Sequence, residues 1–86
     1  MPTICTFFGI IIRMYFEDHS PPHFHAIYQE HEASVAIDTL EILAGTLPRR
    51  ATELVFDWAE LHQKELRDNW YRAQKHQSLE TIEPLE

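Results

Sequence analysis

Apolar positions in the first half of the chain alternate with other side chains, which is the period-two pattern of β-strands. The alternating positions of three successive runs are Ile10, Ile12, Met14 and Phe16, then Phe24, Ala26 and Tyr28, then Ala33, Val35 and Ile37. A four-residue loop over residues 29–32 would pair Phe24 with Ile37 and place the last two sets on one face of a hairpin. His23 and His25 would then lie on the opposite face, away from the core. The pattern predicts an antiparallel sheet with one apolar core face.

Two further strands are expected on either side of this hairpin. Residues 1–8 are expected to form a short initial strand or an extended arm. A tight turn at Thr39-Leu40 would begin a second hairpin with residues 41–46 as the returning strand, and it would place Ala44 beside Val35 on the core face. Leu40 is unusual there, because two-residue turns favour Gly or Asn.

The second half of the chain has the pattern of an amphipathic helix. Pro48 suits the start of a helix, where its missing N–H costs nothing. From residue 51 to residue 73 apolar side chains recur in steps of three and four, and neither Gly nor Pro occurs between residues 49 and 83. We expect one helix from about residue 48 to residue 76, with a break near residues 62–64 as the alternative. The fold class is therefore α+β, a small antiparallel meander of about four strands with a long or broken C-terminal helix packed on one face.

The chain is expected to form one domain over residues 1–77, followed by a short acidic tail over residues 78–86. With 86 residues, the chain is near the lower size limit for a single hydrophobic core. Apolar residues recur every third position in the tail, at Leu79, Ile82 and Leu85. The tail either docks on the domain or orders on a partner.

Charge and cysteine content narrow the class of function. The formal net charge is −7, and Arg13 is the only basic side chain before residue 48 apart from histidines. A protein held on nucleic acid by phosphate contacts carries a basic face, so nucleic acid is expected only as a transient target. Cys5 is the only cysteine, which excludes an internal disulfide and a cysteine zinc cage. Apolar runs too short to cross a bilayer and the lack of a signal-peptide pattern favour a cytoplasmic protein without membrane contact.

The candidate chemistry is concentrated in residues 18–25, which contain His19, His23 and His25 around Pro21-Pro22. A turn has no need of three imidazoles. Side chains two apart on a strand share a face, roughly 6–7 Å apart along the chain, and imidazoles titrate near neutral pH. Arg13 and Tyr15, outward-facing on the preceding strand, are expected in the same layer. The candidate catalytic residues are therefore His19, His23, His25, Arg13 and Tyr15.

Three interpretations of these histidines remain open from the sequence. They could act as an acid–base pair with Arg13 holding a phosphate, which needs no cofactor. They could bind zinc, with His19, Asp18 or His62 completing the ligand set. They could also simply fasten the Pro-Pro turn. Whether the protein is an enzyme is undecided at this point.

The face that carries the histidines is also expected to be apolar. Its apolar side chains would be Ile11, Tyr15, Ile27 and Leu43. An uncovered sheet face of this kind is typical of an interaction site, so a second copy of the chain or another protein is expected to cover it.

Several short motifs occur along the chain in a distinctive order. They are Met1-Pro2-Thr3-Ile4, Phe7-Phe8-Gly9-Ile10, Met14-Tyr15-Phe16, Asp18-His19, Pro21-Pro22-His23-Phe24-His25-Ala26, Leu47-Pro48-Arg49-Arg50 and Trp58-Ala59-Glu60-Leu61-His62. This series resembles the bacterial family catalogued as domain of unknown function 4160, over nearly the whole chain. The Pro-Pro-His-Phe-His string is its most specific part. Members of that family typically have Gly where this chain has Leu40.

The resemblance implies a genetic context and no catalytic residues. Members are small bacterial proteins commonly encoded beside a second small protein of another uncharacterised family (2442), an arrangement that looks like a toxin–antitoxin pair. The leading hypothesis is a toxin-like component that acts through the His19, His23 and His25 face, by metal-independent acid–base cleavage of nucleic acid. An antitoxin-like partner would silence it by covering that face. The alternative is a non-catalytic partner-binding or transcription-regulatory subunit, and the acidic charge disfavours direct DNA recognition by the helix.

Overall fold

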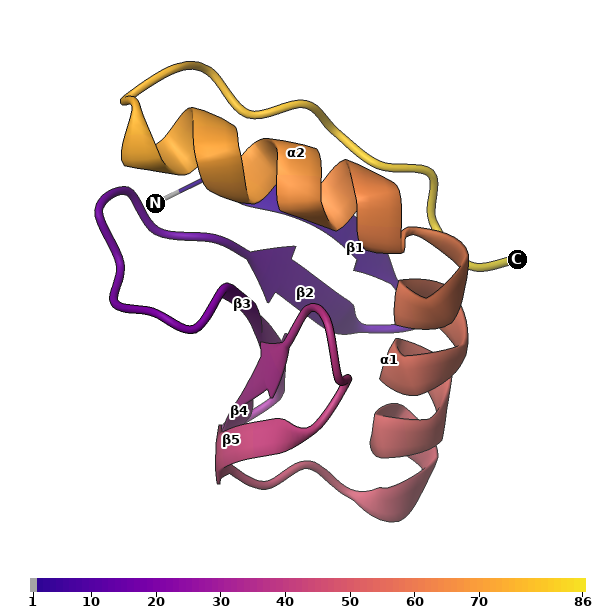
Figure 1. The fold of residues 1–86 in the computed structure, drawn as a ribbon. Helices are drawn as coiled ribbons and strands as arrows, with labels where there is room; N and C mark the ends of the chain where they lie inside the picture. Colours follow the sequence, from indigo (N-terminus) through magenta and orange to yellow (C-terminus); the bar gives the residue numbers. More distant parts are fainter. Residues whose placement is uncertain (1) are drawn as a thin grey trace.

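The computed structural model describes residues 2–86, and within them five antiparallel strands form one meandering sheet in the order β1-β2-β3-β4-β5 (Figure 1). The strands are β1 (Thr3–Phe7), β2 (Ile10–Arg13), β3 (His23–Tyr28), β4 (His31–Ala36) and β5 (Ile42–Gly45). The α+β class is confirmed, whereas the expected number of about four strands was wrong, because β1 pairs along β2 as a full strand. Met1, which was assigned to the initial strand or arm, lies outside the described residues.

Two helices follow the sheet, α1 (Arg49–Leu61) and α2 (Gln63–Gln74). The prediction of one continuous helix was wrong, and the alternative prediction of a break near residues 62–64 is confirmed. The backbone leaves the helical conformation at His62, with φ −127° and ψ 25°. Pro48 caps α1 at its N-terminus as expected. Figure 1 shows the helices meeting at a corner, so that they run in different directions over the domain. Neither of them, nor any other helix among residues 2–86, is long and apolar enough to cross a bilayer.

The hairpin of β3 and β4 differs from the expected register by two residues. Phe24 pairs with Val35 and Ala26 with Ala33, because the connection has only the two turn residues Gln29 and Glu30. A shift of two residues keeps every side chain on its expected face. The core face is therefore as predicted.

The connection from β4 to β5 is longer than the expected two-residue turn. It spans residues 37–41, and the Leu40 N–H donates to the Ala36 carbonyl oxygen over 2.9 Å. A bulge at this point of the ladder pairs Ser34 with Ala44 and Val35 with Ile42. The placement of Ala44 beside Val35 was therefore wrong, because the extra residue moves it across from Ser34.

The core fills the space between the sheet and both helices. Trp58 of α1 is fully buried and contacts the rings of Phe7 and Phe24, with centroids 5.4 and 5.9 Å away. The segment 78–86 runs back along the domain (yellow in Figure 1). In it the Ile82 N–H donates to the Ile4 carbonyl oxygen of β1 over 2.9 Å, and the Ile82 side chain is buried. The structure thus shows the tail docked on its own domain.

Candidate functional site

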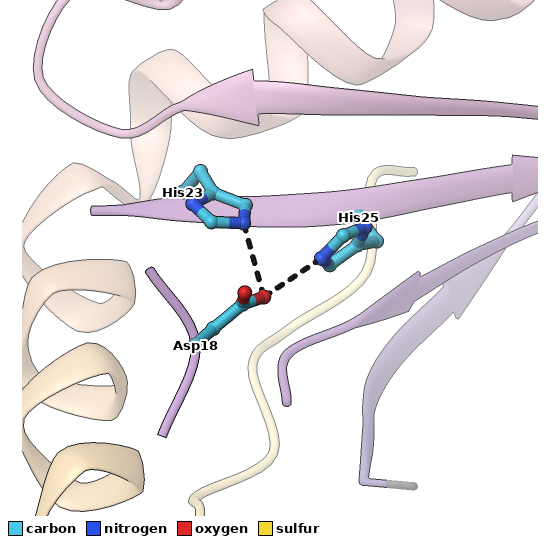
Figure 2. Close-up of side chains that lie close together, drawn as sticks. All are labelled: Asp18, His23 and His25. Atoms are coloured by element: carbon cyan, nitrogen blue, oxygen red, sulfur yellow. Dashed lines mark hydrogen bonds and ion pairs between the residues drawn. The ribbon is translucent and has the colours of Figure 1, made fainter. Parts of the chain in front are cut away.

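Two imidazoles converge on one carboxylate at the start of β3. Nε2 of His23 lies 3.0 Å from Oδ2 of Asp18, and Nε2 of His25 lies 3.1 Å from the same oxygen (Figure 2). The two imidazole centroids are 5.0 Å apart. This trio is named the Asp18–His23–His25 cluster below.

The loop between β2 and β3 carries Asp18 and is fixed to the end of α2. The side-chain amide of Gln74 donates to the Asp18 carbonyl oxygen over 3.2 Å. His76 contacts the Glu17 carboxylate at 2.7 Å. The other oxygen of the Asp18 side chain, Oδ1, accepts the backbone N–H of His19 over 2.9 Å. Asp18 is therefore held through both its backbone and its side chain, which leaves Oδ2 free to face the imidazoles.

His23 is buried, with 8% of its surface exposed. Its Nδ1 lies 2.8 Å from the Pro21 carbonyl oxygen, and its ring packs against Trp70 of α2 with centroids 5.3 Å apart. His23 and His25 were both expected to lie away from the core and the helix packed on it, and this was wrong for His23. The reason is its place as the first residue of β3, where α2 passes beside the loop.

His25 lies two residues after His23 on β3, on the face opposite the core. The ring of Tyr15 packs against it with centroids 4.4 Å apart. Its Nδ1 is 3.3 Å from the hydroxyl oxygen of Ser34 and 3.3 Å from a carboxylate oxygen of Glu32, both on β4. The imidazole is partly buried, and neighbours from β4 and from the β2–β3 loop fix its orientation.

The structure brings some of the other candidate residues to this site and not others. Arg13 pairs with His25 across β2 and β3, and its buried Nε has no hydrogen-bond partner among residues 2–86. His19 is exposed, and only its backbone N–H contacts the cluster. His62 contacts Glu65 at the junction of the helices and is outside the cluster. The structure thus brings Arg13, Tyr15, His23 and His25 together, although Tyr15 lies in the loop after β2 rather than on the strand, and the His19 side chain is not part of this group.

Three residues of the site were missed or undervalued in the sequence. Asp18 was considered only as one of several optional metal ligands, although it is the centre of the cluster. Glu32 was assigned to the loop over residues 29–32, and Ser34 was given no role. The correct two-residue turn would have placed Ser34 directly opposite His25. No local signal in the sequence indicates that Asp18 folds back onto β3.

The electrostatics of the cluster favour an ionised Asp18. Burial alone would raise the pKa of its carboxyl group, but the hydrogen bond from His25, the His19 N–H and the charges of the two imidazoles outweigh it, so the pKa is lowered. A carboxylate between two imidazoles can orient them for proton transfer. The same three side chains could also hold a metal ion, because they offer two nitrogens and one oxygen within 4.8 Å of one another.

Comparison with known protein families gives a match over most of the chain. The model of a family described as domain of unknown function (DUF4160) matches residues 9–71, a shorter stretch than the nearly full-length resemblance seen in the sequence. No curated protein and no solved structure matches the chain.

Proposed function

The chain belongs to the family described as domain of unknown function (DUF4160), and from its site we propose that it is the toxin-like component of a bacterial two-gene module. It acts in the cytoplasm on nucleic acid, through the Asp18–His23–His25 cluster. A small antitoxin-like protein encoded by a neighbouring gene silences it. The observation that carries this proposal is the convergence of two imidazoles on one carboxylate, next to an arginine whose Nε has no hydrogen-bond partner among the described residues.

The arrangement contains the groups that strand cleavage needs. Such cleavage requires a base for the nucleophile, an acid for the leaving group and a cation for the phosphate. The two imidazoles supply the base and the acid once one of them breaks its contact with Asp18. Asp18 orients the imidazoles, as the third member of a catalytic triad does. Arg13 lies directly across the ladder from His25, and its buried Nε has no hydrogen-bond partner among residues 2–86. We assign the guanidinium group of Arg13 to the phosphate. The Tyr15 ring holds His25 in place.

A non-catalytic role is the second candidate, and one observation favours it. Each of the four imidazole nitrogens of His23 and His25 already has a partner among the described residues. In this case the face serves only to bind the partner protein or a second copy of the chain. Ile11 and Ile27, which pair across β2 and β3 beside the cluster, are only partly buried and would contribute apolar contact area.

Expression of the chain alone in a bacterium separates the two candidates. The first predicts growth arrest that co-expression of the neighbour-encoded partner relieves and that His25→Ala abolishes. His31→Ala is the matched control, because this imidazole is 40% exposed and lies outside the cluster. Circular dichroism and immunoblotting confirm that each variant is folded and present. Harmless expression of the wild-type chain supports the second candidate, and full arrest by folded His25→Ala contradicts the first.

A further inference from the structure

The hydrogen bonds of His23 require a positive charge, from a proton or a metal ion, between its Nε2 and Oδ2 of Asp18. A carbonyl oxygen can only accept, so Nδ1 of His23 must carry the hydrogen that is donated to Pro21. In a neutral imidazole the other nitrogen then has a lone pair and no hydrogen. That lone pair would face the lone pairs of Asp18 Oδ2 across 3.0 Å (Figure 2). Either a second proton or a metal ion has to lie between them.

His25 reaches the same situation, with respect to the same oxygen, when its Nδ1 carries the hydrogen. Its Nδ1 lies near the Glu32 carboxylate, which when ionised accepts only, and near the Ser34 hydroxyl, which can donate or accept. With Nδ1–H donated to Glu32, the Nε2 lone pair of His25 also faces Asp18 Oδ2. Two lone pairs and a carboxylate oxygen are therefore directed at one point, inside a partly buried site.

From this geometry we infer that Asp18, His23 and His25 form a binding site for one divalent first-row transition metal ion. The ion replaces the two Nε2 protons that the cluster needs without it. A coordinated Nε2 cannot also act as acid or base, so with the ion bound the acid–base roles proposed above no longer apply to these imidazoles. Zinc bonds of about 2.0–2.2 Å to nitrogen and oxygen place neighbouring ligand atoms about 2.9–3.5 Å apart. The observed separations of 3.0 and 3.1 Å fall in that range. Hydrogen bonds have similar lengths, so the case depends on the proton positions and on the surrounding acceptors.

The acceptors around the cluster are those that support metal-bound histidines. Such a histidine usually donates its other ring N–H to a carbonyl or a carboxylate, which fixes the tautomer. His23 has the Pro21 carbonyl in this position, and His25 has the Glu32 carboxylate. Among residues 2–86, no other three His, Cys, Asp or Glu side chains bring ligand atoms this close together.

The donor set also defines the class of ion. Two imidazoles and one carboxylate favour zinc, iron, cobalt or nickel over magnesium and calcium, which prefer oxygen ligands. Three protein ligands leave positions for water or a substrate, as in catalytic rather than structural metal sites. Metal binding is measured without any activity assay, so it is tested independently of the toxin proposal.

Titration of the metal-free protein tests the inference directly. The tag-free chain is stripped with a chelator and titrated with Zn²⁺ by calorimetry and with Co²⁺ by visible absorption. We expect one ion per chain, with no competition from a large excess of Mg²⁺. Asp18→Asn and His25→Ala should each weaken Zn²⁺ binding at least 100-fold, and Glu32→Gln about 10- to 100-fold. His62→Ala is the matched control, because it removes another imidazole–carboxylate pair and should leave the affinity unchanged.

The outcomes separate this inference from the proposed function. Absence of stoichiometric binding by the wild-type chain overturns it, as does equal affinity of folded Asp18→Asn. Asp18→Asn has nearly the same shape as the wild type, so it remains informative even where His25→Ala does not fold. Growth arrest that requires His25, from a chain that binds no zinc or cobalt, would leave metal-independent acid–base chemistry as the mechanism. Metal binding without growth arrest would remove the toxin role and keep the site.

Discussion

Replacing Asp18 by alanine removes the acceptor that two imidazoles share. The side chains of Asp18, His23 and His25 are only 19%, 10% and 13% exposed, so water replaces the lost contacts poorly. A hydrogen bond to a charged group contributes about 1.5–3 kcal/mol. Both contacts end on one oxygen of a partly exposed carboxylate, and we therefore expect a loss of about 2–4 kcal/mol rather than the full sum. For a domain of this size, each kcal/mol corresponds to roughly 4–8 °C in Tm.

Urea unfolding with a chelator present measures this loss without a contribution from bound metal. Asp38→Ala is the matched control, because its ion pair with Arg67 joins side chains that are 60% and 45% exposed. Such surface pairs contribute at most about 1 kcal/mol. Equal free energies of unfolding for the two variants, with unchanged m-values, would show that the cluster contributes nothing to stability.

The lowered pKa of Asp18 adds a pH dependence with a defined sign. Burial opposes the shift, and the hydrogen bond from His25 with the other favourable contacts causes it. A carboxyl group whose pKa is lower in the folded than in the unfolded state stabilises the fold above the unfolded value of about 3.9. That contribution is lost as the pH falls through the folded value. The difference between the wild type and Asp18→Ala should therefore be smaller below pH ~4 than at pH ~5.

Three further predictions concern the fold around the site. Gly45→Ala should cost about 1–3 kcal/mol more than Gly9→Ala in urea unfolding: both glycines have φ +78°, but a Cβ at Gly45 would lie 2.1 Å from a backbone oxygen of β4 and one at Gly9 only 3.4 Å from a side chain. Equal costs would contradict the clash. Ile82→Ala should lower the free energy of unfolding by about 2–5 kcal/mol, because Ile82 is buried. The control Thr81→Ala, at an exposed position of the same tail, should lower it by under about 0.5 kcal/mol. Equal values would mean that the tail is not docked in solution. Burial raises the pKa of the Cys5 thiol, more than its hydrogen bonds lower it, so alkylation followed by mass spectrometry at pH 8 should be much slower in the folded protein than in urea.

The faces of the sheet could be predicted from the sequence, whereas its exact register could not. Alternation determines which face of the sheet a side chain lies on, but not which residue it pairs with on the next strand. The observed two-residue shift changes the pairing and keeps the faces. The turns carry no signal that would have corrected it. Gln29 and Leu40 both have positive φ, 54° and 60°, without being glycine or asparagine. Glycine is the residue that a positive φ at position 40 favours, and this chain has leucine there.

The site could be predicted only as far as the strand geometry determines it. The spacing of His23 and His25 and the strand before them were enough to bring Arg13 and Tyr15 to the same place. Asp18 and His19 lie in the loop, where no period indicates which side chain points inwards. Contacts with residues more than fifty positions away fix that loop, and they become visible only in the folded chain.

The break between α1 and α2 determines how this loop is held. The apolar pattern predicts one continuous helix, yet α2 changes direction after His62, as Figure 1 shows. With this direction, Trp70 packs on His23 and Gln74 reaches the backbone of Asp18. Both the buried imidazole and the carboxylate are therefore positioned from α2, although neither lies on it. The geometry of the cluster thus depends on the change of helix direction at His62. That change lies about ten residues before Trp70 and Gln74, which make the contacts.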